Sequence, residues 1–434
     1  MANQPPVQSP VAIIGSGMAG YTLARELRKL NAELPITLIC RDNGESYAKP
    51  TLSNAFAQNK TAEHIANATS EQMAESLNIT VMNFYHVSHI DPQQKTVTVH
   101  PVLASDKQQI LPYRQLVLAT GANPRLLPDI TVDNKQIFAV NHLDEYKKFQ
   151  HTIHDLLAKQ ASVKIGIIGA GLIGCEFAND LLTKNTNDNL TIHVFDNATL
   201  PLANQLPPQA GLALQHALEQ GGVTFELGVM INSITAHNAA VEIRLTTAEG
   251  GVITHQVDVV LTAIGLVANT TLAESAGLNV AHLSNDFVSK TQLPRTAKQG
   301  VLVNEFLQTS QPDIYAIGDC ANVAGSFLPY VMPLMNQAKA LAKTLADPSQ
   351  PPTAVSYPAM PVAIKTPSLP LVVLPVSARY PAEQINWQTT PTEDGMILSA
   401  TAKDDPDKLL GFVLVGKEAG KQRLTLSKQV DNWL

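Results

Sequence analysis

Cysteine is scarce in this 434-residue chain, which contains only Cys40, Cys175 and Cys320. An odd, widely spaced set without a C-x-x-C pair argues against a disulfide framework and against a dithiol that passes electrons. Such sparse use of cysteine is typical of a reducing compartment, so we expect a cytoplasmic protein.

Excess basic charge and long apolar runs are also lacking. The formal net charge is -7, whereas a surface that binds nucleic acid needs an excess of positive charge, so we expect no nucleic-acid partner. No stretch approaches the roughly 20 apolar residues of a membrane span, and the polar first residues lack the features of a signal peptide. The histidines are scattered without metal-ligand spacing, so no metal site is predicted.

A glycine-rich turn near the start of the chain is the first positive signal. The apolar residues 11–14 lead into this turn, and leucines at helical spacing follow it. The turn reads Gly15, Ser16, Gly17, Met18, Ala19 and Gly20. Its first glycine permits a tight turn, its second lets the backbone approach a pyrophosphate, and its third lets helix and strand pack closely. We therefore expect a dinucleotide at the N-terminus of the following helix.

The same pattern occurs a second time, after the mostly apolar residues 163–168. This second turn reads Gly169, Ala170, Gly171, Leu172, Ile173 and Gly174. A dehydrogenase with a single nicotinamide site needs only one such unit. Two copies therefore predict two bound dinucleotides.

The residues at the expected acid position differ between the two copies. Asp196 ends the β-forming run after the second turn, where a carboxylate accepts hydrogen bonds from a ribose 2′-hydroxyl and repels a 2′-phosphate. No arginine immediately follows Asp196, which favours NADH over NADPH. After the first turn, Cys40 or Arg41 occupies the usual acid position and Asp42 comes slightly late. Backbone groups or Asp42 are expected to hold the ribose there.

Three further segments resemble the flavoproteins with two dinucleotide-binding domains, the FAD-dependent pyridine nucleotide-disulfide oxidoreductase-like family. Thr120 and Gly121 follow a strand like the one that joins the FAD and NAD domains of these proteins, and Gly265 lies in a second version of that motif. Gly318 and Asp319 resemble the last FAD motif, in which the aspartate accepts a hydrogen bond from a ribityl hydroxyl. The resemblance implies FAD and NADH as cofactors.

Shorter segments resemble the NADH-dependent rubredoxin and ferredoxin reductases of that family. Lys49 begins a Lys-Pro-x-Leu-Ser stretch, and residues 330–335 and 360–367 look most like those of rubredoxin reductases. The resemblance implies an enzyme that passes electrons from NADH through FAD to rubredoxin, an iron-containing electron carrier. Such an enzyme would supply an alkane hydroxylase or an oxygen-detoxifying system.

The resemblance also assigns roles to side chains around the flavin. Lys49 and Glu176 are the predicted catalytic residues, and we expect them to form an ion pair near flavin N5. The helix near Val331 is expected to point its N-terminus at flavin N1 and O2, where Lys365 would add positive charge. Val87 lies on the strand whose backbone contacts adenine in relatives.

The order of the motifs predicts an α/β fold with two nested Rossmann-like domains. An FAD domain of residues 1–125 and 270–350 would be interrupted by an NAD domain of residues 126–269. A small α+β C-terminal domain, residues 351–434, would contain antiparallel strands at apolar runs such as 371–374. Relatives use this last domain for dimer contacts or for docking the acceptor. The oligomeric state, monomer or homodimer, stays open.

Other functions use the same motifs. One is the ferredoxin reductase of an oxygenase system. Another is an NADH oxidase or peroxidase, but those relatives carry a redox-active cysteine around positions 45–55, where this chain has none. A third is a non-catalytic redox sensor, in which FAD reduced by NADH switches binding to another protein.

Overall fold

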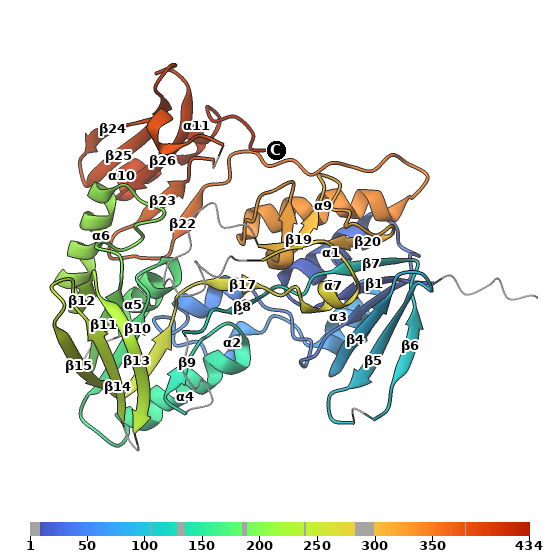
Figure 1. Ribbon diagram of the computed structural model, residues 1–434, viewed down its shortest axis with the longest axis horizontal. Helices are drawn as coiled ribbons and strands as arrows, with labels where there is room; N and C mark the ends of the chain where they lie inside the picture. Colours follow the sequence, from blue (N-terminus) through green and yellow to red (C-terminus); the bar gives the residue numbers. More distant parts are fainter. Residues whose placement is uncertain are drawn as a thin grey trace, which may run out of the picture.

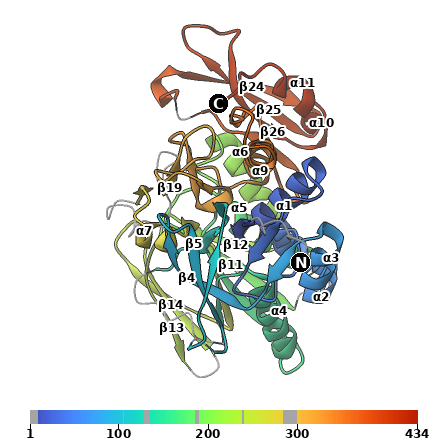
Figure 2. The same cartoon turned by 90° about the vertical axis from the view of Figure 1, so that its right-hand side faces the viewer.

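Two parallel sheets and one antiparallel sheet form the three bodies of the molecule (Figure 1). The computed structural model describes residues 9–434 apart from 105, 128–134, 185–188, 238–239, 283–298 and 378. The first parallel sheet lies at the right of Figure 1 and the second at the left, with the C-terminal strands, drawn in red, above the second. Figure 2 shows the C-terminal body at one end of the molecule.

The first sheet is built from short apolar strands that are mostly buried. Its order is β20-β7-β1-β2-β3, and every neighbouring pair is parallel. The strands are β1 Val11–Ile14, β2 Ile36–Ile39, β3 Thr80–Met82, β7 Gln115–Leu118 and β20 Ile314–Ala316. Continuous apolar runs suit parallel strands that are covered on both faces. Because β20 pairs with β7, segments far apart in sequence share this sheet.

The second sheet repeats this design within the interval between β7 and β20. Its order is β12-β11-β10-β16-β9, again with parallel pairs throughout. The strands are β9 Ile137–Phe138, β10 Val163–Ile168, β11 Leu190–Asp196, β12 Val223–Leu227 and β16 Val259–Thr262. The predicted fold class, with one Rossmann-like unit inserted into another, is confirmed.

Two three-stranded antiparallel sheets accompany the parallel ones. The first consists of β4 Tyr85–Asp91, β5 Thr96–Pro101 and β6 Gln109–Pro112. The second consists of β13 Met230–His237, β14 Ala240–Thr246 and β15 Val252–Val257. This second sheet, called the meander below, packs on β11 and its neighbours through an apolar cluster that includes Phe195, Ile243 and Val257.

Helices cover the sheets, and α1 Met18–Leu30, α5 Leu172–Lys184 and α9 Val331–Ala346 begin at the cavity described below. α1 starts in the first glycine turn and packs against α9, while α5 starts in the second turn. The other helices of this region are η1 Lys49–Asn54, α2 Ala62–Ile65, α3 Ser70–Leu77, α4 Leu143–Leu157, α6 Pro208–Gln220, α7 Thr271–Ser275 and η2 Gly318–Cys320. Over the part of the chain that the structure describes, no helix has the length and apolar character that crossing a membrane requires.

Short strands link the first two bodies. β8 Ala122–Pro124 leaves the first sheet and pairs antiparallel with β17 Leu266–Ala268, which leaves the second. The chain passes from the first body to the second through β8 and returns through β17, so the two connections form one two-stranded ribbon. The remaining short strands are β18 Val280–Ala281, β19 Gly300–Val303 and β21 Ala321–Val323.

The C-terminal body is an antiparallel sheet of order β22-β23-β26-β25-β24 with short helices. Its elements are β22 Val362–Ile364, β23 Leu371–Leu374, η3 Ala382–Gln384, β24 Ile385–Thr392, β25 Gly395–Ala402, β26 Leu409–Val415, α10 Lys417–Gly420 and α11 Arg423–Ser427. Leu398 and Val413 share an apolar cluster with Phe177 and Leu181 of α5. The predicted α+β C-terminal domain is confirmed, and its packing brings the end of β22 against α5.

Candidate functional site

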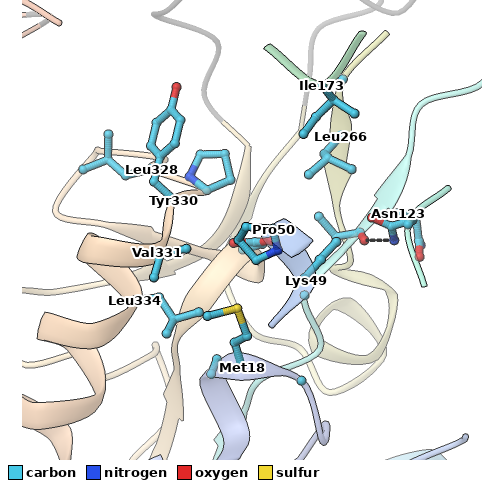
Figure 3. A pocket seen from close by; sticks show the side chains of 18 of the residues that line it. Met18, Lys49, Pro50, Asn123, Ile173, Leu266, Leu328, Tyr330, Val331 and Leu334 are labelled. Atoms are coloured by element: carbon cyan, nitrogen blue, oxygen red, sulfur yellow. Dashed lines mark hydrogen bonds between the residues drawn. The ribbon is translucent and has the colours of Figure 1, made fainter. Parts of the chain in front are cut away.

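A cavity of about 1620 Å³ lies where the three bodies meet. Both glycine turns, η1, the N-terminal end of α9 and parts of the C-terminal body form its wall. Drug-sized ligands occupy pockets of roughly 300–1,000 Å³, so this cavity has room for larger molecules. Figure 3 shows side chains that converge on it from separate elements, among them Met18, Lys49, Ile173, Leu266 and Val331.

Most of the residues that we selected from the sequence line this one cavity. They are Gly15, Ser16, Gly17, Met18, Ala19, Cys40, Arg41, Lys49, Val87, Thr120, Gly121, Gly169, Gly171, Leu172, Ile173, Glu176, Asp196, Gly265, Asp319, Val331 and Lys365. The three selected residues outside its lining are Gly20, Gly174 and Gly318. The tertiary structure thus gathers residues from all parts of the sequence around one space.

The first glycine turn keeps its backbone bare on the cavity side. Gly15 has φ +119°, and a Cβ there would lie 2.2 Å from the carbonyl oxygen of Ala119. A Cβ on Gly20 would lie 1.9 Å from the carbonyl oxygen of Gly15, so only glycine allows α1 to pack this closely. A Cβ on Gly17 would meet nothing within 4 Å, because that position faces open space.

The second turn has the same geometry. A Cβ on Gly169, at φ +107°, would lie 2.6 Å from the carbonyl oxygen of Ala263, and one on Gly174 would lie 1.9 Å from that of Gly169. A Cβ on Gly171 would again meet nothing within 4 Å. The two turns therefore present equivalent backbone surfaces to the cavity.

The start of α1 suits a negatively charged group. No side chain caps the helix, and its first turn contains no acidic residue. The free N–H groups and the positive end of the helix dipole favour an anion at this position. The first turn therefore fits the pyrophosphate of a dinucleotide. The second turn fits one as well, because its backbone surface is equivalent to that of the first.

The carboxylates near the two turns are tied to the turns themselves. Asp196 is 2% exposed, and its Oδ2 accepts a hydrogen bond of 2.5 Å from the backbone N–H of Ala170. Near the first turn, Asp42 Oδ1 accepts hydrogen bonds from the Ser16 hydroxyl and the Gly44 N–H, both at 3.1 Å. Each carboxylate therefore lies beside the turn where a ribose would follow a pyrophosphate.

Lys49 and Asp319 face the cavity as a pair of opposite charges. Burial lowers the pKa of Lys49, and the carboxylate of Asp319 opposes that shift. Burial also raises the pKa of Asp319, and Lys49 opposes that shift in turn. The two side chains place opposite charges on the part of the wall that η1 and η2 form.

Glu176 forms its ion pair with Lys365, and our prediction that it pairs with Lys49 is wrong. The Glu176 side chain is 1% exposed, and its Oε2 lies 2.5 Å from Nζ of Lys365. Oε2 also accepts a 2.5 Å hydrogen bond from the Ser53 hydroxyl, while Oε1 accepts one of 3.0 Å from the backbone N–H of Lys365. β22 ends at Ile364, and the next residue, Lys365, brings both its backbone N–H and its ammonium to Glu176.

A second buried carboxylate lies one helical turn further along α5. Asp180 accepts hydrogen bonds from the backbone N–H groups of Phe56 and Ala57, at 2.9 and 3.0 Å. Burial raises the pKa of Asp180 to about 6, although these hydrogen bonds act in the opposite direction. Residues four apart on a helix share one face, so Glu176 and Asp180 together hold the η1 segment against α5.

Sequence reasoning did not select Ser53 or Asp180. Ser53 lies in the Lys-Pro-x-Leu-Ser stretch that pointed to Lys49, so its segment was visible although its contact with Glu176 was not. Asp180 lies four residues after Glu176 on α5, a spacing that would have indicated a second carboxylate on the same face.

The start of α9 lines the cavity, and Figure 3 shows Tyr330, Val331 and Leu334 on this part of its wall. No side chain caps this helix, and its first turn contains no acidic residue. The positive end of the α9 dipole therefore acts on the cavity without an acidic side chain in the first helical turn.

Gly318 brings η2 close to α1, because a Cβ on this glycine would lie 2.8 Å from that of Ala19.

The three cysteines contribute no reactive thiol among the described residues. All three are free and buried. Burial raises the pKa of Cys40 to about 12, and it also raises the pKa values of Cys175 and Cys320. Since the thiolate is the reactive form, these side chains are unsuited to pass electrons through a disulfide.

Comparison with known proteins gives two family matches. Residues 9–342 match the family described as pyridine nucleotide-disulphide oxidoreductase. Residues 354–430 match the family described as rubredoxin binding C-terminal domain.

Individual relatives cover almost the whole chain. Rubredoxin-NAD(+) reductase of Acinetobacter baylyi is 44% identical over 421 residues, which is 97% of this chain and 98% of that protein. The protein of the same name from Alcanivorax borkumensis is 36% identical with the same coverage. Among solved structures, NADH:rubredoxin oxidoreductase from Clostridium acetobutylicum shares the fold, with a TM-score of 0.70, 21% identity, and coverage of 98% of this chain and 95% of that one.

Proposed function

Since this chain belongs to the pyridine nucleotide-disulphide oxidoreductase family, we propose that it oxidises NADH through bound FAD and passes the electrons to rubredoxin. The observation that carries the proposal is the meeting of three parts on one cavity. Two equivalent glycine turns line it, and so does Lys365, which belongs to the region that matches a rubredoxin-binding domain. Full-length relatives at 44% and 36% identity are named for the same reaction.

The residues of the first body fit FAD. The turn from Gly15 to Gly20 would hold its pyrophosphate, and Asp319 would accept a hydrogen bond from its ribityl chain. FAD supplies the chemistry that accepts two electrons from a nicotinamide and releases them singly. Lys49 and the positive end of α9 would stabilise negative charge at the flavin ring.

The residues of the second body fit NADH. The turn from Gly169 to Gly174 would hold its pyrophosphate, and Asp196 beside it would select a ribose without a 2′-phosphate. The network of Glu176, Lys365 and Ser53 lines the same cavity and fixes η1, α5 and the end of β22 relative to one another. Such fixed positions favour the close approach of two rings that hydride transfer requires.

The proposal is tested by the acceptor that supports turnover. The FAD-loaded protein is mixed with NADH and cytochrome c, with or without a purified rubredoxin, and cytochrome c reduction is followed. We expect reduction to depend on rubredoxin and to be faster with NADH than with NADPH. A parallel reaction replaces rubredoxin with a [2Fe–2S] ferredoxin.

Other results would assign a different function. Faster turnover with ferredoxin would indicate a ferredoxin reductase, and rapid oxygen consumption without any carrier would indicate an oxidase. A stable complex of NADH with the flavin and negligible turnover with every acceptor would indicate a sensor. Each of these outcomes contradicts the proposal.

A further inference from the structure

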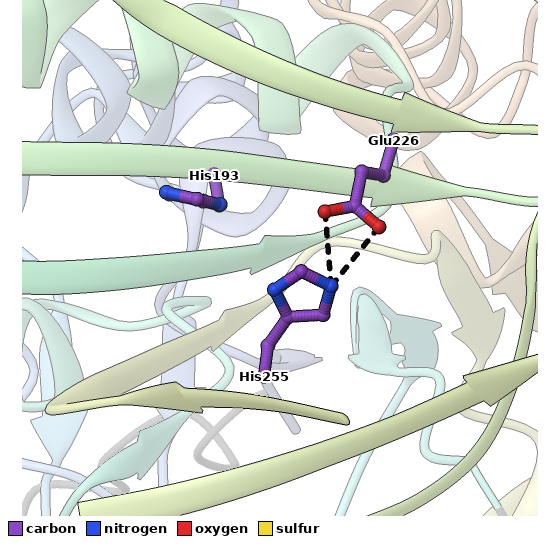
Figure 4. Close-up of side chains that lie close together, drawn as sticks. All are labelled: His193, Glu226 and His255. Carbon is purple, nitrogen blue, oxygen red and sulfur yellow. Dashed lines mark hydrogen bonds and ion pairs between the residues drawn. The ribbon is translucent and has the colours of Figure 1, made fainter. Parts of the chain in front are cut away.

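Two histidines and a glutamate gather on the second body, away from the cavity. His193 lies on β11, Glu226 on β12 and His255 on β15, and one possible ligand atom from each lies within 4.8 Å of the other two (Figure 4). The Nε2 atom of His255 is 2.9 and 3.0 Å from the two carboxylate oxygens of Glu226. None of the three residues lines the large cavity.

Strand register explains why the three side chains share one side of the sheet. β11 and β12 are parallel, with His193 opposite Thr224 and Phe195 opposite Glu226. Because side chains alternate along a strand, His193, Phe195 and Glu226 point to the same face. The meander covers this face, and its strand β15 brings His255 over Phe195, with ring centroids 5.1 Å apart. The cluster therefore lies at the rim of the interface between the meander and the parallel sheet.

The cluster contains an unsatisfied polar atom. Nδ1 of His193 is buried and has no hydrogen-bond partner among the residues that the structure describes. A buried nitrogen without a partner costs free energy, which an ion recovers by binding to that nitrogen. The rings of His193 and His255 are 6.0 Å apart and tilted by 56°, so two imidazoles face a shared space beside one carboxylate.

We propose that His193, Glu226 and His255 bind one divalent transition-metal ion of the Zn²⁺ type. Two imidazoles and a carboxylate are a ligand set that such ions accept, with a water at the fourth position of a tetrahedron. Metal–ligand bonds of about 2.0–2.1 Å place tetrahedral ligand atoms roughly 3.4 Å apart, so small side-chain rotations from the observed spacing suffice. The side chains of His255 and Glu226 are 21% and 24% exposed, which leaves access for the ion and the water.

An ion bound here would add a link among three strands, beyond the apolar packing of the interface and the contact between His255 and Glu226. It would connect the meander to β11 and β12, and it would leave the cavity and its charged residues untouched. The site is therefore independent of the proposed NADH reaction, and the two proposals fail separately. The expected consequence is a more stable second body when the ion is bound.

The test is a calorimetric titration of the FAD-loaded, chelator-treated protein with Zn²⁺. We expect one saturable site and a rise in the thermal unfolding midpoint when Zn²⁺ is present. Mg²⁺ and Ca²⁺ at millimolar concentration should neither bind there nor compete, because these ions prefer oxygen ligands. Rubredoxin-dependent turnover is measured on the same samples and should not depend on the metal.

Variants identify the ligands. Glu226→Gln and His255→Gln should each weaken Zn²⁺ binding at least tenfold and remove the rise in midpoint. The matched control is His237→Gln, an exposed histidine of the same meander, which should bind Zn²⁺ as the unmodified chain does. Flavin absorbance of each variant reports whether it has folded.

A second measurement needs no variant. Bound Zn²⁺ should protect His255, which is partly exposed, from modification by diethyl pyrocarbonate, as read by peptide mass spectrometry. The proposal is overturned if Zn²⁺ shows no saturable binding. It is equally overturned if binding survives both ligand substitutions or if His255 is modified at the same rate with and without Zn²⁺.

Discussion

The ammonium of Lys365 lies 2.5 Å from the carboxylate of Glu176, a side chain that is only 1% exposed. The pair joins the C-terminal body to α5, and the Ser53 hydroxyl connects both residues to η1. Three segments distant in sequence thus meet at one buried charge. Burying a charge costs much free energy unless it is paired and hydrogen-bonded, so each partner depends on the other.

Removing both partners should therefore destabilise the protein by less than the sum of the two single removals. Lys365→Met leaves a buried carboxylate without its cation and should cost about 3 kcal/mol, at the low end for buried pairs because the Lys365 side chain is 27% exposed. The double variant Lys365→Met, Glu176→Gln should cost less than the sum of the two single changes. Urea unfolding of the unmodified chain, the single variants Lys365→Met and Glu176→Gln, and the double variant measures this coupling.

An exposed ion pair provides the control for that comparison. Lys147 and Glu63 are 2.6 Å apart, with side chains 48% and 63% exposed. Lys147→Met should leave the unfolding midpoint nearly unchanged, because solvent screens such pairs. Additive effects at Lys365 and Glu176 would show that the buried pair has no special coupling.

Asp180 should make stability depend on pH. Burial raises its folded-state pKa from 3.8 to about 6. A raised pKa means that the folded state binds the proton more tightly, so this contribution is fully present below pH 4 and is lost as pH rises through 6. The shift corresponds to a contribution on the order of 3 kcal/mol.

The measurement compares thermal midpoints of the unmodified chain and of Asp180→Asn between pH 4.5 and pH 7.5. The midpoint of the unmodified chain, relative to the variant, should fall as the pH increases. The control is Asp155→Asn on the exposed side of α4, which should show no such trend. A difference between the chain and Asp180→Asn that stays constant with pH contradicts the assignment.

Asp196 should determine the choice between NADH and NADPH. Asp196→Ala removes a carboxylate that would bind a ribose hydroxyl and repel a 2′-phosphate, so KM for NADH should rise about tenfold and that for NADPH should fall. Asn197→Ala, at the exposed next position, should change neither value. Steady-state kinetics with both nucleotides measures the effect, and unchanged KM values in the Asp196 variant would refute the role.

Lys49 should raise the reduction potential of the flavin. Removing its positive charge in Lys49→Met should disfavour the reduced, negatively charged flavin by about 1–2 kcal/mol at an effective dielectric constant near 20. For a two-electron couple this lowers the potential by roughly 20–40 mV. A dye-equilibrated redox titration measures the shift, with Lys148→Met on the surface of α4 as the control. An unshifted potential would place Lys49 away from the flavin.

Local motifs carried most of what could be predicted. The Gly15 and Gly169 turns were recognisable because the residues that make each turn, helix start and strand are neighbours in sequence, and their steric requirements leave only glycine. The order of these motifs also indicated the insertion of one sheet into the other. The resemblance also placed a helix start near Val331, where α9 begins.

Contacts between distant segments could not be predicted in the same way. Lys49 and Lys365 both belong to segments that pointed to the flavin, and nothing in the sequence said which cation would reach Glu176. The grouping of His193, Glu226 and His255 was equally invisible, because no short spacing connects them.

The sequence by itself determined the two glycine turns, the nested order of the sheets and the absence of a C-x-x-C cysteine pair. The turns and the lack of a cysteine pair can be read from short stretches of residues, because backbone sterics and residue type act locally. The nested order of the sheets follows from the order of those stretches along the chain. Only the tertiary structure decided the partner of Glu176, the raised pKa of Asp180 and the histidine cluster on β11, β12 and β15. Burial and pairing of charges arise between segments that are far apart in sequence. How closely those segments approach depends on how whole sheets pack, and no single segment encodes it.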